Sequence, residues 1–317
     1  MAPVHGAIDR WRAANTAPAY RLTAQVFRNL LAARVALSAH SQVEAEPIDL
    51  IANLPSSLRH LRPASVIVGT PGSHRSLVVR LIDQNRTLRA ALKIAVTPGA
   101  GEGIRLEIEA LRDPRLSHRA PELLHTGTVA SRDAMVTAHV PGRPLRYDFR
   151  GIAAAVQFWS TTGVPPTSVW AAEHPWIAKA AASAGVDLDT LVQALPGRIA
   201  QTRTHGDFAP WNLLDAGGAH TVAIDWESST ADGLPTADVA HFVMASERLL
   251  RRSAPTDAAA KAASVLMEHL GHDMRTAWTI TGLAASATAH RERSTGGQDD
   301  TAASWEEAAQ HALAHGI

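Results

Sequence analysis

Residues 205–214 read HGDFAPWNLL, and the chain continues with AIDWE at 223–227. Pro210 cannot continue a helix and biases Ala209 away from helical backbone, so this segment predicts a loop that carries Asp207 and Asn212. The next residues predict a hairpin, because LLD is followed by a Gly-Gly turn and then by TVAI. Such a hairpin would bring Asp225 back beside Asn212.

The three polar side chains of this segment offer oxygen atoms of two kinds. Carboxylate and amide oxygens suit Mg²⁺, which is commonly held by one or two protein oxygens together with substrate phosphates. We therefore expect Asn212 and Asp225 to hold Mg²⁺. Asp207 would then accept a proton from an incoming hydroxyl group, as an aspartate does in kinase phosphoryl transfer.

Composition excludes several classes of protein. The chain has 317 residues, enough for two packed units, and its formal net charge of +0 gives no reason to expect a nucleic-acid partner. It contains no cysteine, which removes disulfides, thiolate zinc sites and a cysteine nucleophile. Its first residues, MAPVHGAIDRW, do not resemble a signal peptide, and no apolar run is long enough for a transmembrane segment. We expect a cytoplasmic protein.

Lysine is rare in this chain. Only Lys93, Lys179 and Lys261 are lysines among 30 basic residues, and the rest are arginines. Lys93 lies inside the apolar run ALKIAV at 91–96, which is typical of a strand. Its position therefore favours a role that needs a compact ammonium group rather than a guanidinium fork.

Changes in residue pattern along the chain predict three regions: an N-terminal helical extension at 1–62, a β-rich region at 63–140 and a mostly helical region at 141–317. In the extension, residues 20–37 predict an amphipathic helix. This helix is expected to pack on its own protein, although a partner-binding or membrane-surface role is the alternative. In the helical region, the segment 205–227 quoted above is expected to be the only strand-forming segment.

The β-rich region predicts five strands and one helix. Apolar residues recur at Ile104, Ile108 and Leu111, one face of a helix. The expected strands lie at 64–69, 76–83, 87–96, 123–129 and 134–140.

HGDFAPWN followed by IDWE resembles the catalytic and metal-binding segments of the aminoglycoside phosphotransferase and choline kinase-like family. The resemblance implies an α+β, two-lobed, protein-kinase-like fold, with a small antiparallel β lobe that carries one helix and a larger, mostly helical lobe. It also implies that Asp207 is the catalytic base and that Asn212 and Asp225 hold Mg²⁺. His205 would support the loop, and Asp238 in the later segment GLPTADVAHF would be structural.

The same resemblance assigns nucleotide-binding residues in the region 63–140. Lys93 would bind the α and β phosphates, and its acidic partner would be Glu107, with Glu109 as the alternative. Ser73 and His74 lie where the family has a phosphate-covering hairpin, although an ordinary turn explains this segment as well. The backbone at Ala138 and Val140 would contact adenine.

These features predict an O-phosphotransferase that uses ATP or GTP with Mg²⁺ and phosphorylates a hydroxyl of a small molecule, such as a sugar, an amino sugar, an antibiotic or a similar metabolite. HGD lacks the arginine of the His-Arg-Asp segment of protein kinases, and Asp-Trp-Glu stands in place of their Asp-Phe-Gly. A small-molecule acceptor is therefore favoured over a protein. The alternatives are a catalytically silent, kinase-shaped binding or regulatory protein and a regulatory protein kinase. The sequence leaves the oligomeric state open.

Overall fold

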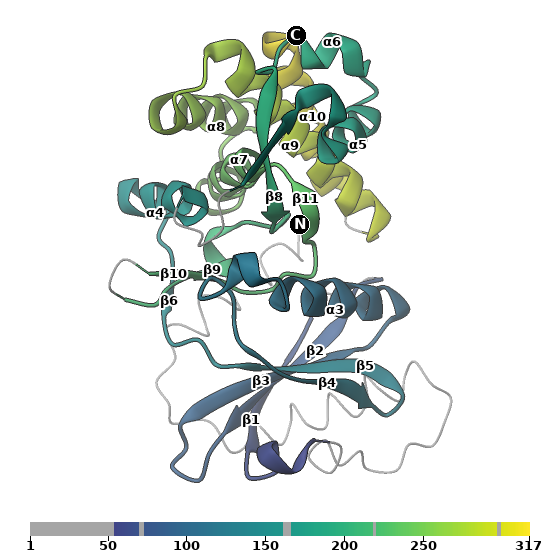
Figure 1. Cartoon of the computed structure of the whole chain (residues 1–317), viewed down its shortest axis with the longest axis vertical. Coiled ribbons are helices and arrows are strands. Elements are labelled where there is room, and N and C mark those ends of the chain that lie inside the picture. Colours follow the sequence, from purple (N-terminus) through teal and green to yellow (C-terminus); the bar gives the residue numbers. More distant parts are fainter. Residues whose placement is uncertain (1–53, 70–72, 161–165, 218–219, 297–298) are drawn as a thin grey trace. The chain divides into compact units, whose positions relative to one another are not determined.

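The computed structural model describes residues 54–69, 73–160, 166–217, 220–296 and 299–317 (Figure 1). The amphipathic helix expected at 20–37 lies outside these residues. None of the helices within the described ranges is both long and apolar enough to cross a membrane.

The chain divides into two compact units. Of the described residues, unit 1 contains those from Leu54 to Arg112 together with Pro121–Val140, and unit 2 contains Asp113–Ala120 together with those from Pro141 to Ile317. Leu54 and Leu61 are buried in the core of unit 1, which therefore includes residues that precede position 63.

Unit 1 is a five-stranded antiparallel sheet with one helix packed against it (Figure 1). The strand order is β1-β2-β3-β5-β4, and the helix follows the central strand β3 in the chain. Its elements are η2 (Ser56–Leu58), β1 (Arg62–Val68), β2 (Ser76–Ile82), β3 (Leu88–Ala95), α3 (Pro98–Leu111), β4 (Leu123–Val129) and β5 (Arg132–Ala138).

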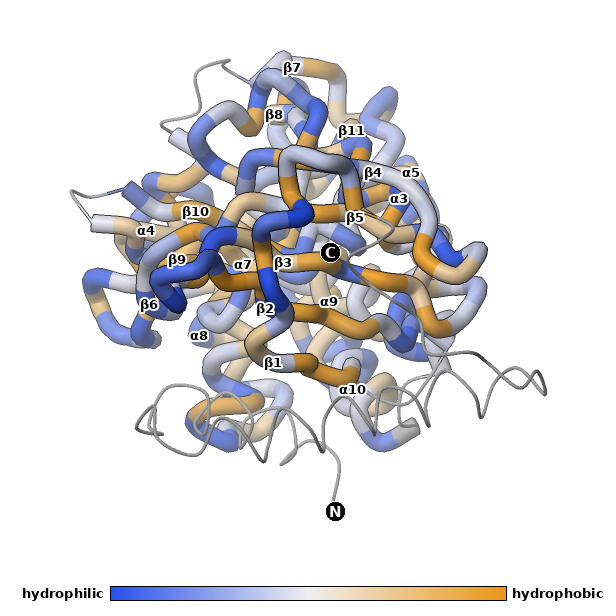
Figure 2. The backbone as a smooth tube through the Cα atoms, turned by 90° about the horizontal axis from the view of Figure 1, so that it is seen from below, coloured by the Kyte–Doolittle hydropathy of each residue, from blue (hydrophilic) through white to orange (hydrophobic). Residues whose placement is uncertain are grey.

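The two faces of β3 bury different sets of side chains. Leu92 and Ile94 are each 1% exposed and belong to the main apolar core of the sheet. Because side chains alternate along a strand, Lys93 and Ala95 lie on the opposite face. Ala95 packs there with Ile104 of α3. The hydrophobic colouring along β3 in Figure 2 reflects its central place in the sheet.

Unit 2 is mostly helical. Helices α7, α8, α9 and α10 pack against one another, and Phe242 of α7 is fully buried. The helical elements are η3 (Pro114–Leu116), α4 (Phe149–Ser160), η4 (Ala171–Glu173), α5 (Pro175–Ala184), α6 (Leu188–Val192), η5 (Pro210–Asn212), α7 (Pro235–Ala245), the π-helix η6 (Ser246–Arg251), α8 (Pro255–Leu270), α9 (Met274–Ser294) and α10 (Asp299–Gly316). The predicted α+β fold, with a small antiparallel β unit that carries one helix and a larger helical unit, is confirmed.

Unit 2 also contains strands that the sequence did not predict. The prediction that the segment 205–227 is the only strand-forming segment of the helical region is wrong. Strand β8 ends directly before His205. Its sequence RIAQTRT lacks the apolar pattern typical of a strand, because Thr202, Arg203 and Thr204 occupy buried positions. The strands are β6 (Arg143–Pro144), β7 (Thr167–Trp170), β8 (Arg198–Thr204), β9 (Leu213–Asp215), β10 (Thr221–Ala223) and β11 (Thr230–Gly233).

A buried ion cluster ties the segment 113–120 to β8 within unit 2. Arg203 Nε donates to Asp113 Oδ2 at 2.8 Å, and Arg115 donates to the same carboxylate with its shortest contact at 2.7 Å. Burial raises the pKa of Asp113, but the hydrogen bonds from Arg115 and Arg203 outweigh it and lower this pKa to about 2. The ionised carboxylate is therefore the form that the fold stabilises.

We predict that Asp113→Asn destabilises the protein. Removing one partner of a buried ion pair leaves Arg203 uncompensated, at a cost of about 3 kcal/mol at pH 7. An acid whose pKa is lowered by folding stabilises the protein above its unfolded value, near 3.9, and loses this contribution as the pH falls toward the folded value of about 2. Urea unfolding as a function of pH should therefore show a decline between about pH 4 and 2 that is weaker in the variant.

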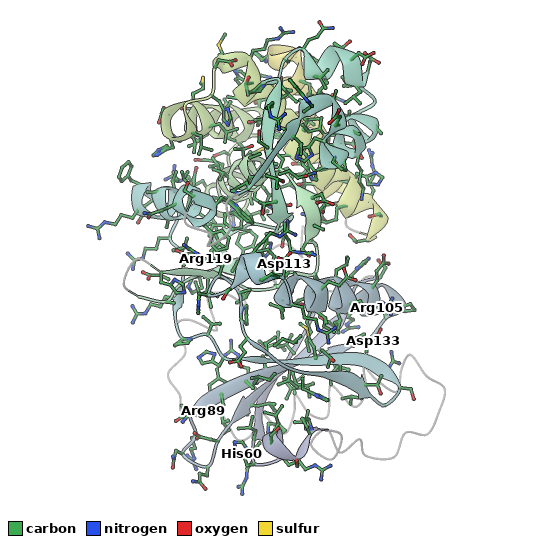
Figure 3. The ribbon with its side chains drawn as sticks, viewed as in Figure 1. His60, Arg89, Arg105, Asp113, Arg119 and Asp133 are labelled. Carbon is green, nitrogen blue, oxygen red and sulfur yellow. The ribbon has the colours of Figure 1, made fainter. Side chains whose placement is uncertain are left out.

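Asp133→Asn in unit 1 is the matched control. Arg105 and Asp133 point toward one another (Figure 3) and form a 2.8 Å ion pair whose side chains are 62% and 37% exposed. Exposed pairs contribute at most about 1 kcal/mol. Equal losses of stability in the two variants would contradict the assignment of Asp113 as a buried structural anion.

Candidate active site

A buried ion pair joins the central strand of unit 1 to its helix. Lys93 Nζ donates to Glu107 Oε2 at 2.8 Å, and the two side chains are 9% and 5% exposed. Glu107 is buried on α3, whereas Glu109, the alternative partner in the sequence analysis, is exposed. The pair has the arrangement found in kinases, where a lysine of the third strand is held by a glutamate of the following helix.

The turn that contains Ser73 and His74 is attached to the start of α3. Thr97 Oγ1 donates to the carbonyl oxygen of Ser73 at 2.5 Å and accepts from the backbone N–H of Arg75 at 3.0 Å. A Cβ added at Gly99 would lie only 2.5 Å from the Ser73 carbonyl oxygen. The turn and the helix N-terminus thus approach each other closely, and a role for Ser73 and His74 in phosphate binding stays a prediction.

The segment predicted to contact adenine is the end of β5. The Ala138 N–H donates to the Glu122 carbonyl oxygen at 2.8 Å, and the His139 N–H donates to the Arg89 carbonyl oxygen at 2.8 Å. Both amides therefore serve the sheet of unit 1. Contact of the backbone at Ala138 and Val140 with adenine stays a prediction.

In unit 2, one buried carboxylate fixes the loop that starts at His205. Asp238 on α7 accepts the backbone N–H of His205 at 2.7 Å with Oδ2 and that of Gly206 at 3.0 Å with Oδ1. Gly206 has φ +77°, and a Cβ at this position would lie 2.2 Å from the Ser228 carbonyl oxygen. The turn therefore requires glycine at 206 and an acceptor at 238.

The His205 side chain supports this loop from inside the core. Its Nδ1 accepts the backbone N–H of Asp207 at 3.2 Å, so Nε2 carries the proton and donates to the Ile224 carbonyl oxygen at 2.9 Å. The ring is fully buried, and burial lowers its pKa. His205 thus connects the loop to the returning strand as a neutral imidazole.

Asp207 is held by several donors. Asn212 Nδ2 donates at 2.9 Å to Asp207 Oδ2 and at 2.9 Å to its carbonyl oxygen. His241 Nε2 lies 3.2 Å from Oδ1, and Arg291 donates to the same oxygen at 3.5 Å. The side chain of Asp207 nevertheless keeps 36% of its surface exposed, so a ligand can still reach the carboxylate.

The pKa values of Asp207, on this loop, and Asp238, which supports the loop, are shifted in opposite directions. For Asp207, burial raises the pKa, but the hydrogen bond from His241 and the charge of Arg291 outweigh it, so this pKa lies well below its usual range. For Asp238, burial dominates and raises the pKa to about 7, against its backbone hydrogen bonds. Asp207 is therefore the carboxylate that stays ionised throughout the neutral pH range.

The predicted hairpin is present. Strands β9 and β10 pair antiparallel with Leu213 opposite Ala223, and the Ile224 N–H donates to the Asn212 carbonyl oxygen at 2.8 Å. Asp225 follows directly and has φ +69°, a backbone conformation that is uncommon for residues other than glycine. Strained backbone of this kind is frequent at functional sites.

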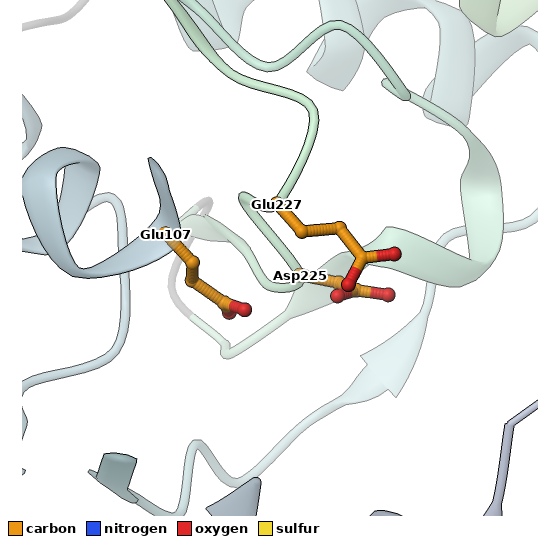
Figure 4. A group of neighbouring side chains, drawn as sticks. All are labelled: Glu107, Asp225 and Glu227. Atoms are coloured by element: carbon orange, nitrogen blue, oxygen red, sulfur yellow. The ribbon is translucent and has the colours of Figure 1, made fainter. Parts of the chain in front are cut away.

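Asp225 has a second acidic residue nearby. Figure 4 shows Asp225 and Glu227 on the segment that follows β10, and each offers a carboxylate oxygen within 4.8 Å of the other. Asn212 donates with Nδ2 to Asp207, which leaves its amide oxygen as the atom that can bind a cation. An amide oxygen and carboxylates form a hard, oxygen-only donor set, which fits Mg²⁺.

Sequence reasoning missed three side chains of this site. His241 and Arg291, which contact Asp207, lie 34 and 84 residues away in the chain. His241 belongs to the quoted segment GLPTADVAHF, where only Asp238 received a role, and no motif contains Arg291. Glu227 belongs to the quoted stretch AIDWE, of which only Asp225 was expected to be a ligand. The hairpin pairing of Asn212 with Ile224 follows the spacing of the sequence. The contact of Lys93 with Glu107 is the one that the family resemblance implied.

Comparisons with known proteins give structural matches only, since neither a family model nor a curated protein matches the chain. Among solved structures, the chain is similar to an aminoglycoside-3'-phosphotransferase of type VIII, with 18% identity and a TM-score of 0.40, over 85% of this chain and 98% of the other. It is similar to an ethanolamine kinase of Plasmodium vivax, with 11% identity and a TM-score of 0.48, over 78% and 81% of the two chains. A choline kinase of Cryptosporidium parvum has 13% identity and a TM-score of 0.45, over 89% and 94%. These values are low, and the function must be argued from the residues of the chain itself.

We predict that Gly206→Ala destabilises unit 2 strongly. The substitution forces an L-residue into a left-handed conformation, which costs about 1–2 kcal/mol, and it also places a methyl group against the Ser228 carbonyl oxygen. The total loss in free energy of unfolding should reach about 3 kcal/mol.

Gly185→Ala is the matched control because Gly185 has φ +67° but no atom within 4 Å of an added Cβ. This variant should lose only the conformational part, about 1–2 kcal/mol. Thermal unfolding of the two variants compares them directly, and a smaller loss at Gly206 than at Gly185 would contradict the close approach to Ser228.

Proposed function

We propose that the chain is a nucleotide-dependent O-phosphotransferase that moves the terminal phosphoryl group of ATP or GTP to a hydroxyl of a small molecule. The observation that carries the proposal is the geometry around Asp207. Asn212 donates to Asp207. The backbone of Ile224, the residue before Asp225, is hydrogen-bonded to that of Asn212. A loop aspartate, an asparagine five residues later and a second aspartate after a hairpin are the polar groups that kinases use for phosphoryl transfer.

The proposed roles in unit 1 concern the nucleotide. Lys93, held by Glu107, would bind the α and β phosphates as a fixed ammonium group. The turn at Ser73 and His74 would add polar groups near the phosphates, and backbone at Ala138 and Val140 would contact the base. The region 63–140 is thus proposed to bind the nucleotide.

The proposed roles in unit 2 concern the metal and the chemistry. Asn212 and Asp225 would hold Mg²⁺, which when bound neutralises charge on the phosphates. Asp207 would accept a hydrogen bond from the acceptor hydroxyl and orient its oxygen for attack. The region 141–317 is therefore proposed to carry the catalytic and acceptor-binding groups.

The low pKa of Asp207 defines how this residue would act as a base. Efficient general bases have pKa values near the working pH, and that of Asp207 lies well below it. A carboxylate of this kind orients a neutral hydroxyl and takes its proton only once the bond to phosphorus has largely formed. The proposed mechanism therefore depends on positioning more than on basicity.

We predict that Asp207→Asn lowers turnover by about 10²- to 10⁴-fold, because the amide cannot accept the hydroxyl proton. Affinity for Mg-ATP should change less than about twofold, since the proposed nucleotide contacts involve other residues. Mass spectrometry of a panel of hydroxylated metabolites incubated with Mg-ATP or Mg-GTP measures turnover as the gain of one phosphoryl group, and calorimetry measures nucleotide binding.

Asp215→Asn is the control for this variant, because Asp215 is an exposed acid on the same hairpin. It should retain the turnover of the original protein. If Asp207→Asn keeps the turnover of the original protein, Asp207 is not the catalytic base. If the original protein binds nucleotide but phosphorylates no acceptor, a catalytically silent binding protein is favoured.

We also predict that Lys93→Met lowers affinity for Mg-ATP by at least about tenfold, because a charged group on the phosphates is worth 1.4 kcal/mol or more. Lys179→Met is the matched control, since Lys179 is exposed on α5 and is one of only three lysines in the chain. Calorimetric titration at a temperature where both variants are folded gives the comparison. A loss of affinity common to both lysine variants would contradict a specific role for Lys93.

A further inference from the structure

His241 is the one side chain of α7 with a hydrogen bond to the Asp207 carboxylate within the described residues. Its Nε2 lies 3.2 Å from Asp207 Oδ1, and its side chain is only 5% exposed. Nothing in the motif that contains Asp207 requires a histidine on α7. The contact therefore raises the question of what His241 does for the carboxylate.

The imidazole of His241 is itself held from two sides. Its Nδ1 lies 3.1 Å from Thr288 Oγ1 of α9, and its ring stacks on Trp305 of α10, with centroids 5.3 Å apart and planes 10° from parallel. The Thr288 hydroxyl can donate to Nδ1 when the ring is neutral. When the ring is protonated, the hydroxyl accepts from Nδ1 and donates to the Ala284 carbonyl oxygen, 2.9 Å away. Thr288 thus holds the ring in both protonation states.

In both states Nε2 carries a proton and donates to Asp207. The neutral ring that accepts at Nδ1 has its proton on Nε2, and the protonated ring has one on each nitrogen. Two helices and a stacked indole therefore direct one N–H group at a single oxygen, Oδ1.

The donors around Asp207 are distributed unequally between its two oxygens. Oδ1 accepts hydrogen bonds from His241 and Arg291. The guanidinium of Arg291 also donates to the Gly206 carbonyl oxygen. Oδ2 receives Asn212 alone among the hydrogen bonds of the described residues. Because a carboxylate oxygen can accept about two hydrogen bonds, the remaining position for an incoming hydroxyl lies on Oδ2.

We propose that His241 is a positioning residue for Asp207, which fixes Oδ1 so that Oδ2 receives the acceptor hydroxyl. This inference rests on the proposed phosphotransferase function. His241 acts through Asp207 and does not itself touch the substrate.

Two amide variants separate positioning from packing. In His241→Gln the side-chain amide nitrogen can take the place of Nε2 and donate to Asp207, whereas in His241→Asn the shorter amide reaches only the position of Nδ1 near Thr288. We expect His241→Asn to lower kcat by about 10- to 100-fold with little change in the KM for ATP, because misplacing a reacting group costs up to about this factor. His241→Gln should recover kcat to within about fivefold of the original protein.

His174→Gln controls for the loss of a buried histidine. His174 is also fully buried in unit 2, but its hydrogen bond goes from Nε2 to the Ala200 carbonyl oxygen of β8. This variant should lose stability without a change in kcat at temperatures where it is folded. If His241→Asn and His174→Gln affect kcat equally, His241 has only a packing role and the inference is overturned.

Spectroscopy of the histidine rings tests the contact independently of any acceptor. Nitrogen–proton correlation spectra of protein with labelled histidine report which ring nitrogen is protonated, and the His241 signal is the one absent from His241→Gln. We expect the neutral His241 ring to carry its proton on Nε2. A proton on Nδ1 would turn a lone pair toward the Asp207 carboxylate and would overturn the inference.

The two arms also separate this inference from the proposed function. If the original protein phosphorylates no acceptor, the proposed function fails and the catalytic part of the inference fails with it. If the original protein is active and His241→Asn has unchanged kcat, only the positioning role of His241 is overturned.

Discussion

The site in unit 2 depends on the hydrogen bonds that Asp238 accepts from the backbone of His205 and Gly206. These two amides lie at a left-handed turn that no regular element could satisfy, and unpaired buried amides would each cost about 1–3 kcal/mol. With both amides satisfied, the chain can turn sharply out of β8 and leave the carboxylate of Asp207 partly exposed. His205 then links the same turn to the returning strand through Ile224.

Fixed donors around Asp207 replace the water that would otherwise solvate its charge. Asn212, His241 and Arg291 come from three different elements, yet all direct N–H groups at one carboxylate. The cost of such preorganisation is met by folding, so it need not be met again when a reaction occurs. The hydrogen bond from His241 and the charge of Arg291 outweigh burial and lower the pKa of Asp207. In the proposed reaction this carboxylate would therefore orient a hydroxyl rather than act as a strong base.

The features that the sequence predicted are those with short-range causes. The hairpin that returns Asp225 spans only a few residues. The pairing of Lys93 with Glu107 was implied by the family resemblance, with Glu109 as the alternative, and the phase of α3 explains why Glu107 is the partner. Glu107 lies three residues after Ile104 and four before Leu111, so it shares the buried face of α3. His241 and Arg291 could not be predicted because their contacts depend on how α7 and α9 pack. Strand β8 was missed because polar side chains fill its buried positions.

The fate of the terminal phosphoryl group of ATP tests the central claim most directly. The protein should be incubated with Mg²⁺, ATP labelled in that group and a mixture of hydroxylated small molecules, and the label should then be located. We predict that the label appears on a soluble small molecule, that this requires Mg²⁺ and that Asp207→Asn nearly abolishes it. Label found only on protein, or no transfer to any molecule, would contradict the account.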